Sequence, residues 1–166
     1  MSDRAVFDCM VYLQAAANPS GPAFACFALV DAGKVTLCTS APIFAEVRDV
    51  LNRPALRTKF PRLTAERVEA FLCNVEAKAV VLAEVPHVFS YPRDPDDEPY
   101  LNIAVAAGAK HLVSRDKDLL DLMSDSDFRS RFPDLTILDP VAFLQVVSGK
   151  NQPEQDGGQS QQGEAD

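Results

Sequence analysis

The segment RDPDDEPYLNIAVAAGAKHLVSRDKDLL, residues 93–120, is the most informative part of the chain for its fold. It opens with an acidic loop broken by prolines, and residues 100–107 then form a nearly all-apolar stretch that predicts a buried helix. Residues 111–114 predict a strand, with a further helix after it. A buried helix that leads into a strand is the alternation expected of an α/β protein.

The same alternation extends over most of the chain. Strands are predicted at residues 5–7, 35–38, 80–85 and 136–138, and helices at residues 11–17, 22–31, 42–52, from Thr64 onward and at 141–147. Strands separated by helices favour a parallel sheet that is covered by helices on both faces. Functional sites in such sheets lie beyond the carboxyl ends of the strands, so catalytic or ligand-binding residues are expected at that edge.

The length and composition of the chain predict a single domain in a reducing compartment. The chain has 166 residues, of which 47% are hydrophobic, and its four cysteines are spread out, which predicts buried reduced thiols. Only two histidines occur, so a zinc site is poorly supported. No segment is long and apolar enough for a membrane span and the start does not resemble a signal peptide, which predicts a cytoplasmic protein.

The charge distribution separates a domain from a tail. We predict a folded domain at residues 1–148 and a disordered, acidic, Gln/Gly-rich tail at 149–166. The formal charge of −8 argues against broad electrostatic binding of nucleic acid. Acidic side chains that hold a metal ion, together with a local basic patch, would still allow an acidic protein to act on RNA.

Acidic residues from four segments are predicted at one edge of the sheet. Asp8 directly follows the first strand, Asp116 follows the fourth, and Glu46 lies at the rim of the buried face of the helix after the second strand. Clustered carboxylates repel one another unless protons or cations offset the charge, and oxygen ligands suit Mg²⁺ or Mn²⁺. Such ions activate water for attack on a phosphodiester. The remaining acids of this set are Asp94, Asp96 and Asp97 in the proline-broken loop, and Asp118.

Each acid also has a structural interpretation. Asp97 could cap the buried helix, Asp118 could favour a helix start, and Asp94 could be a turn residue. Asp8 and Glu46 are harder to explain in this way, because acids at the edge of a core cost free energy without partners. Taken singly, each aspartate suits a structural role better, whereas the whole set favours a metal site.

Three segments together resemble a PIN domain: AVFDCMVYLQA (residues 5–15), SAPIFAEVRDVLNRP (40–54) and residues 93–120. The chain is similar in style to the VapC-like PIN proteins, toxin components of bacterial toxin–antitoxin pairs, over roughly residues 4–147. The resemblance implies a three-layer α/β/α sandwich with a parallel, about five-stranded sheet. It also implies a ribonuclease that uses Mg²⁺ or Mn²⁺.

The resemblance assigns roles to particular residues. It implies Asp8, Glu46, Asp97 and Asp116 as catalytic and metal-binding residues, Asp118 as a further metal ligand, and Ser114 and Asp94 as supporting residues. Met10 departs from the family, which often has Asn at that position, so a catalytically weak or inactive RNA- or protein-binding module is the alternative. Aspartyl-phosphate chemistry is disfavoured, because the first strand is followed by Asp8-Cys9-Met10 and lacks a second acid.

Basic residues for RNA contact are concentrated in one stretch. Residues 48–67 hold six basic and two acidic side chains, a net +4. A solvated helix–loop face explains this excess about as well as a nucleic-acid surface does. The expected partners are an RNA substrate, a cognate antitoxin and a second copy of the chain. The candidate RNA-binding residues are Arg48, Arg53, Arg57, Arg115 and Lys117.

Overall fold

A computed structural model describes residues 2–150 and has the predicted α/β architecture. Within this range, five strands form one parallel sheet in the order β3-β2-β1-β4-β5. The predicted fold class and the strand number are therefore confirmed. The strands are β1 (Asp3–Phe7), β2 (Val35–Ser40), β3 (Val80–Leu82), β4 (His111–Val113) and β5 (Thr136–Leu138).

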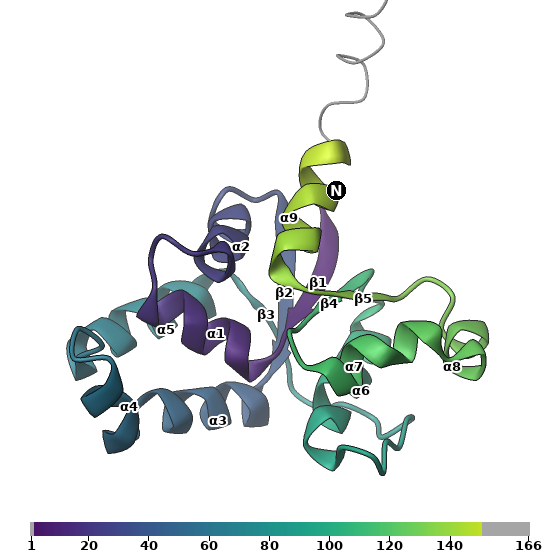
Figure 1. Cartoon of the computed structure of the whole chain (residues 1–166), viewed down its shortest axis with the longest axis horizontal. Coiled ribbons are helices and arrows are strands. Elements are labelled where there is room, and N and C mark those ends of the chain that lie inside the picture. Colours follow the sequence, from purple (N-terminus) through teal and green to yellow (C-terminus); the bar gives the residue numbers. More distant parts are fainter. Residues whose placement is uncertain (1, 151–166) are drawn as a thin grey trace, which may run out of the picture.

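Helices cover both faces of the sheet. Figure 1 shows α1 to α5 and α9 on one side and α6 to α8 on the other, and α6 packs against β1, β2 and β4. In the described part of the chain, no helix has the length and apolar character that crossing a bilayer requires. The helices are α1 (Cys9–Ala17), α2 (Pro22–Asp31), α3 (Ala41–Leu51), α4 (Pro54–Lys59), α5 (Ala65–Lys78), α6 (Glu98–Ala107), α7 (Lys117–Asp121), α8 (Ser126–Arg131) and α9 (Pro140–Lys150), with 3-10 turns η1 (Pro95–Asp97) and η2 (Leu122–Ser124).

The strand order reverses between β1 and β4. The chain runs outward from β1 to β2 and β3, then crosses back to β4 on the other side of β1. Phe7 pairs with Val113, so the chain leaves the two strands at the same level and then turns into α1 and toward α7. A reversal of this kind opens a crevice at the carboxyl ends of the strands, where open α/β sheets bind ligands.

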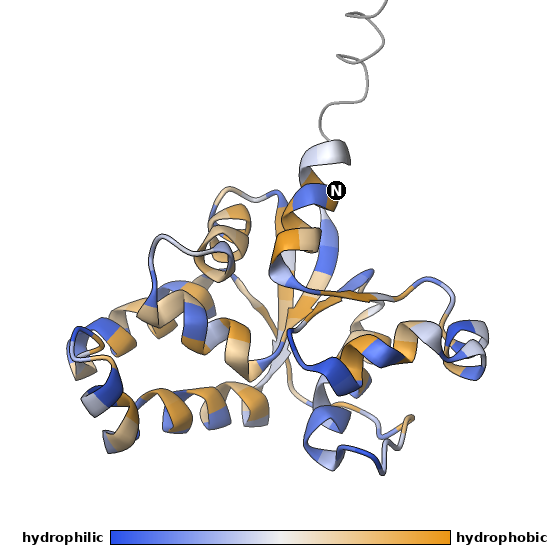
Figure 2. Cartoon of the chain, in the orientation of Figure 1, coloured by the Kyte–Doolittle hydropathy of each residue, from blue (hydrophilic) through white to orange (hydrophobic). Residues whose placement is uncertain are grey.

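The core lies between the sheet and its helices. Phe7 of β1 packs edge-on against Phe27 of α2 and Phe143 of α9, with ring centroids 5.0 and 5.9 Å apart. Figure 2 shows hydrophobic residues along the strands and hydrophilic residues at the periphery. Among the thiols, Cys26 and Cys38 are buried and Cys9 is half-buried, but Cys73 is exposed. The prediction of four buried thiols is thus wrong for Cys73, which lies on the solvent side of α5.

Helix starts agree with the predictions, whereas several boundaries differ. The Ser40 and Thr64 hydroxyls accept hydrogen bonds from the backbone N–H groups of Ile43 (3.3 Å) and Arg67 (3.2 Å), as N-caps do. Helices α4 and α8, both of which are short, were not predicted from the sequence. Helix α9 extends two residues past the predicted domain boundary at 148, and the rest of the predicted tail, 151–166, lies outside the described residues.

Strand β3 ends at Leu82, so the predicted strand at residues 80–85 is too long. The segment after it is held by the buried amide of Asn102 on α6 in place of sheet hydrogen bonds. The Asn102 Oδ1 accepts hydrogen bonds from the N–H groups of Val88 and Phe89, both at 2.8 Å. The Asn102 Nδ2 donates to the carbonyls of Phe89 (3.1 Å) and Glu98 (3.0 Å). Asn102 therefore holds Val88 and Phe89 of the segment that leads into η1.

We expect Asn102→Ala to cost about 2 kcal/mol in the free energy of unfolding, because it removes both acceptors and donors and leaves half-buried backbone N–H groups unpaired. Amide exchange at Val88 and Phe89 should accelerate before global unfolding. Denaturant titration and hydrogen-exchange mass spectrometry would measure both effects. Asn74→Ala is the control, since exposed Asn74 bonds only Asp31 in the described structure. Unchanged exchange in Asn102→Ala would contradict the anchoring role.

Candidate metal centre

Three carboxylates converge beyond the ends of β1 and β4. Asp94, Asp97 and Asp116 each place one carboxylate oxygen within 4.8 Å of the others. Asp94 is the N-cap residue of the 3-10 turn η1 and Asp97 is its last residue, and side chains three residues apart in such a turn are eclipsed. Asp116 comes from the other side of the crevice, at the N-terminus of α7. Elements far apart in the sequence therefore meet at one point of negative charge.

Asp97 is the most constrained member of this cluster. Its side chain is 7% exposed, and its Oδ2 is buried without a hydrogen-bond partner among the described residues. Although Asp97 occupies the N-cap position of α6, its side chain accepts no capping hydrogen bond, so the capping alternative does not explain it. Burial raises the pKa of Asp97 above its ordinary value, and repulsion from Asp116 and Asp94 raises it further.

Asp8 lies beside the cluster and is linked to it through a hydroxyl. The buried Ser114 Oγ donates to Asp8 Oδ2 and accepts from the backbone N–H of Asp116 at 2.9 Å. Asp8 Oδ1 also caps α1 by accepting from Val11 N at 3.1 Å. Burial raises the pKa of Asp8 to about 6, while the hydrogen bonds from Ser114 and Val11 hold it lower than burial alone would.

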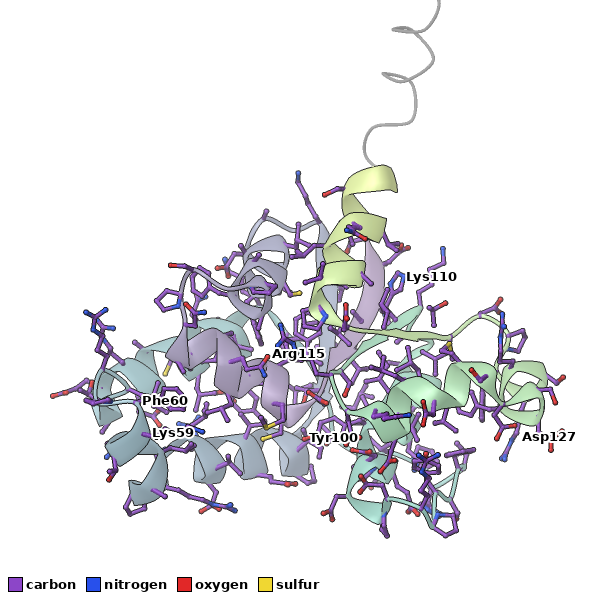
Figure 3. The ribbon with its side chains drawn as sticks, in the orientation of Figure 1. Lys59, Phe60, Tyr100, Lys110, Arg115 and Asp127 are labelled. Atoms are coloured by element: carbon purple, nitrogen blue, oxygen red, sulfur yellow. The ribbon has the colours of Figure 1, made fainter. Side chains whose placement is uncertain are left out.

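Glu46 faces the crevice from α3. It is exposed and lines a cavity of about 380 Å³ between α3, the segment after β3 and the start of α6. It is not one of the three converging acids. Burial raises the pKa of Cys9 and of Tyr100, and the charges of Glu46 and Asp8 raise both pKa values further. The buried Tyr100 Oη has no partner in the described structure, and Figure 3 shows Tyr100 at the centre of the molecule. Glu46 therefore lines the cavity beside the start of α6 and stands apart from the three converging carboxylates.

Asp94 and Asp118 lie in different surroundings. Asp118 pairs with Arg93 at 2.7 Å and does not join the three converging carboxylates. Asp94, expected as a supporting residue, is a member of that cluster. The three-residue spacing of Asp94 and Asp97 across Pro95 is the sequence signal that could have indicated this, because a 3-10 turn aligns such side chains.

The donor set fits a hard divalent cation. It consists of carboxylates alone, and the buried unpaired oxygen of Asp97 lacks the positive partner that a charged group at this depth requires. Asp94, Asp97 and Asp116 could hold Mg²⁺ or Mn²⁺ directly, with Asp8 adjacent.

A family model described as the PIN domain matches residues 4–118, well over half of the chain. The chain belongs to the PIN-domain family. PIN domains are typically metal-dependent nucleases, which agrees with an acidic cluster at the strand reversal. The match ends within α7, earlier than the predicted limit at 147, although β5 continues the same sheet beyond it. No curated protein matches this PIN domain significantly.

Most of the predicted RNA-binding cations of this PIN domain have internal partners. Arg48 pairs with Glu69, Arg53 with Asp49, and Lys117 with Asp121. Arg57 donates to the Leu63 carbonyl at 3.1 Å and to Asn52 Oδ1 at 2.9 Å. Arg115 differs, since within residues 2–150 it is exposed and makes neither a hydrogen bond nor an ion pair.

We expect Asp97→Asn to stabilise the metal-free protein at pH 8 by about 1–2 kcal/mol, because it removes a buried charge that Asp94 and Asp116 repel. The pKa of Asp97 in the folded protein is raised above its unfolded value, so the penalty is complete above the folded pKa, shrinks as the pH falls and is absent below the unfolded pKa. The gain should therefore shrink toward pH 4.5. Denaturant unfolding in EDTA at both pH values measures it.

The control for this prediction is Asp96→Asn, which removes the same charge from an exposed neighbour in the same turn. Its stability should differ little from that of the unmodified protein at either pH. An equal gain from both variants would mean that general charge reduction, and not the cluster, is the cause.

Ser114→Ala should raise the pKa of Asp8 above about 6, because it removes a donor to the charged carboxylate. It should also weaken Mn²⁺ binding by about tenfold, as loss of an outer partner of a ligand typically does. Carboxyl-carbon NMR titration and calorimetry would measure these changes, with Ser130→Ala on α8 as the exposed serine control. Unaltered Mn²⁺ affinity would argue against Asp8 as part of the metal centre.

Proposed function

We propose that this protein is a metal-dependent ribonuclease that hydrolyses phosphodiester bonds of RNA. The observation that carries the proposal is the buried, unpaired carboxylate oxygen of Asp97 beside Asp94 and Asp116, at the strand reversal of a PIN domain. Such a group is costly in the metal-free protein and favourable next to a cation. The acids therefore have a chemical use in a position where they are a structural disadvantage.

Different residues have different roles in the proposed reaction. Mg²⁺ or Mn²⁺, when bound, supplies an activated water and offsets charge on the phosphodiester oxygens. Asp94, Asp97 and Asp116 hold the ion, and Ser114 fixes the orientation of Asp8 behind them. Glu46, exposed in the cavity beside the start of α6, is available to orient water or accept a proton.

The test is cleavage of a labelled single-stranded RNA by the full chain with Mn²⁺ or Mg²⁺, beside a DNA strand of the same sequence. We expect cleavage of the RNA that stops in EDTA. Asp97→Asn should lower the rate at least as much as the roughly 10–100-fold lost when an outer partner of a metal ligand is removed. Asp96→Asn should cleave normally, because Asp96 is exposed and lies outside the cluster. Cleavage that persists in EDTA, or equally in Asp97→Asn, would exclude this mechanism.

A binding module is the second candidate, and Met10 is the observation that favours it. An apolar side chain stands where the family often has Asn, and it is 48% exposed. Tight Mn²⁺ and RNA binding without turnover would support this alternative. The narrower assignments to a toxin, with a cognate antitoxin and a homodimer, stay predictions of the sequence resemblance.

A further inference from the structure

A second groove lies next to the acidic cluster and has the opposite electrostatic character. It has a volume of about 350 Å³ and runs along α1, bounded by the start of α2, by α4 and by the residue after Ser114. Although the chain carries a formal charge of −8, no acidic side chain lines this groove. The lining residues that matter here are the apolar Met10, Leu56 and Phe60 and the basic Lys59 and Arg115.

Both cations of the groove are available to a ligand. Arg115 is exposed, and across the described residues it has no acidic partner. Lys59 is also exposed, and its ammonium lies 5.6 Å from the centroid of the Phe60 ring, a contact that orients it without neutralising it. Arg48 and Arg53, by contrast, are paired with acids on the same side of the protein.

The groove begins where the acidic cluster ends. Arg115 is the residue between Ser114, which holds Asp8, and Asp116 of the cluster. Met10 lies two residues after Asp8, and its side chain forms part of the groove wall. Figure 3 shows Arg115 toward the centre of the molecule and Lys59 with Phe60 toward the α4 end. A chain that lies in this groove would pass directly from two cations to the carboxylates.

We propose that this groove binds the single-stranded RNA segment next to the phosphodiester that is cut, with Arg115 and Lys59 on its phosphates and Met10, Leu56 and Phe60 against its bases. The inference rests on the proposed nuclease function and deepens it. Two unpaired cations along an apolar floor match the alternation of charged phosphates and flat bases in a single strand. Met10 thus has a role of its own, since an apolar side chain suits a base-contacting wall better than an amide would.

The test is RNA binding by the full chain carrying Asp97→Asn, which limits hydrolysis, with a fluorescent ten-nucleotide single strand. Adding Arg115→Gln should weaken binding about 5–10-fold and Lys59→Gln about 3–5-fold. Each should lower the slope of log affinity against log salt by about 0.7. The matched control is Arg129→Gln, which removes one exposed positive charge on α8, at the opposite end of the molecule from α4 in Figure 1. Its affinity and salt slope should not change.

Two further measurements locate the RNA and separate this inference from the proposed function. RNA containing 4-thiouridine should crosslink to peptides that include Met10 or Phe60. Crosslinks confined to the cavity beside Glu46, or variants that bind like Arg129→Gln while the unmodified chain cleaves RNA, would overturn the groove assignment and leave the nuclease intact. If the unmodified chain neither binds nor cleaves RNA, both are overturned. Binding of an acidic peptide in place of RNA would also overturn the groove assignment.

Discussion

The parallel pairing of β1 with β4 is the constraint on which the rest of the site depends. Because Phe7 and Val113 are register partners, Asp8 and Ser114 emerge side by side, and one hydroxyl can then join the Asp8 carboxylate to the backbone at Asp116. The turn with Asp94 and Asp97 belongs to the connection from β3 to β4 and completes the acidic cluster. The electrostatic cost of that cluster therefore follows from the strand pairing together with the position of this turn.

The parallel sheet and the positions of Asp8 and Asp116 after β1 and β4 could be predicted, because they follow from local apolar patterns and from the rule that sites form at the carboxyl ends of parallel strands. The order of the strands could not, because it depends on which strands pair across the sheet. The end of β3 could not, because Val85 continues the apolar pattern while the loop hydrogen bonds that replace the sheet come from distant Asn102. The sequence also could not predict which basic side chains form ion pairs within the protein. Whether Arg48 meets Glu69 depends on how α3 packs against α5.

Charge is divided between two neighbouring regions of the surface. On one side of Ser114, carboxylates converge, and on the other, Arg115 and Lys59 line a groove that contains no acid. The net charge of −8 conceals this separation, because most other basic side chains near α3 and α4 are used in internal contacts. Local arrangement, and not total charge, therefore decides whether an anionic polymer can approach such a protein.

Asn102 anchors the connection between β3 and η1 through backbone atoms, which every residue type except proline provides. Asn102 holds backbone atoms of Val88 and Phe89, so this part of the path toward Asp94 and Asp97 is fixed through the main chain. Ala83, Val85 and His87 of that connection line the cavity beside Glu46. Val85 packs against the core and His87 bonds Glu98, whereas the exposed Ala83 can change in size and polarity while the acids keep their places. At Ala83 the cavity wall can therefore vary without a change in the acidic centre that it borders.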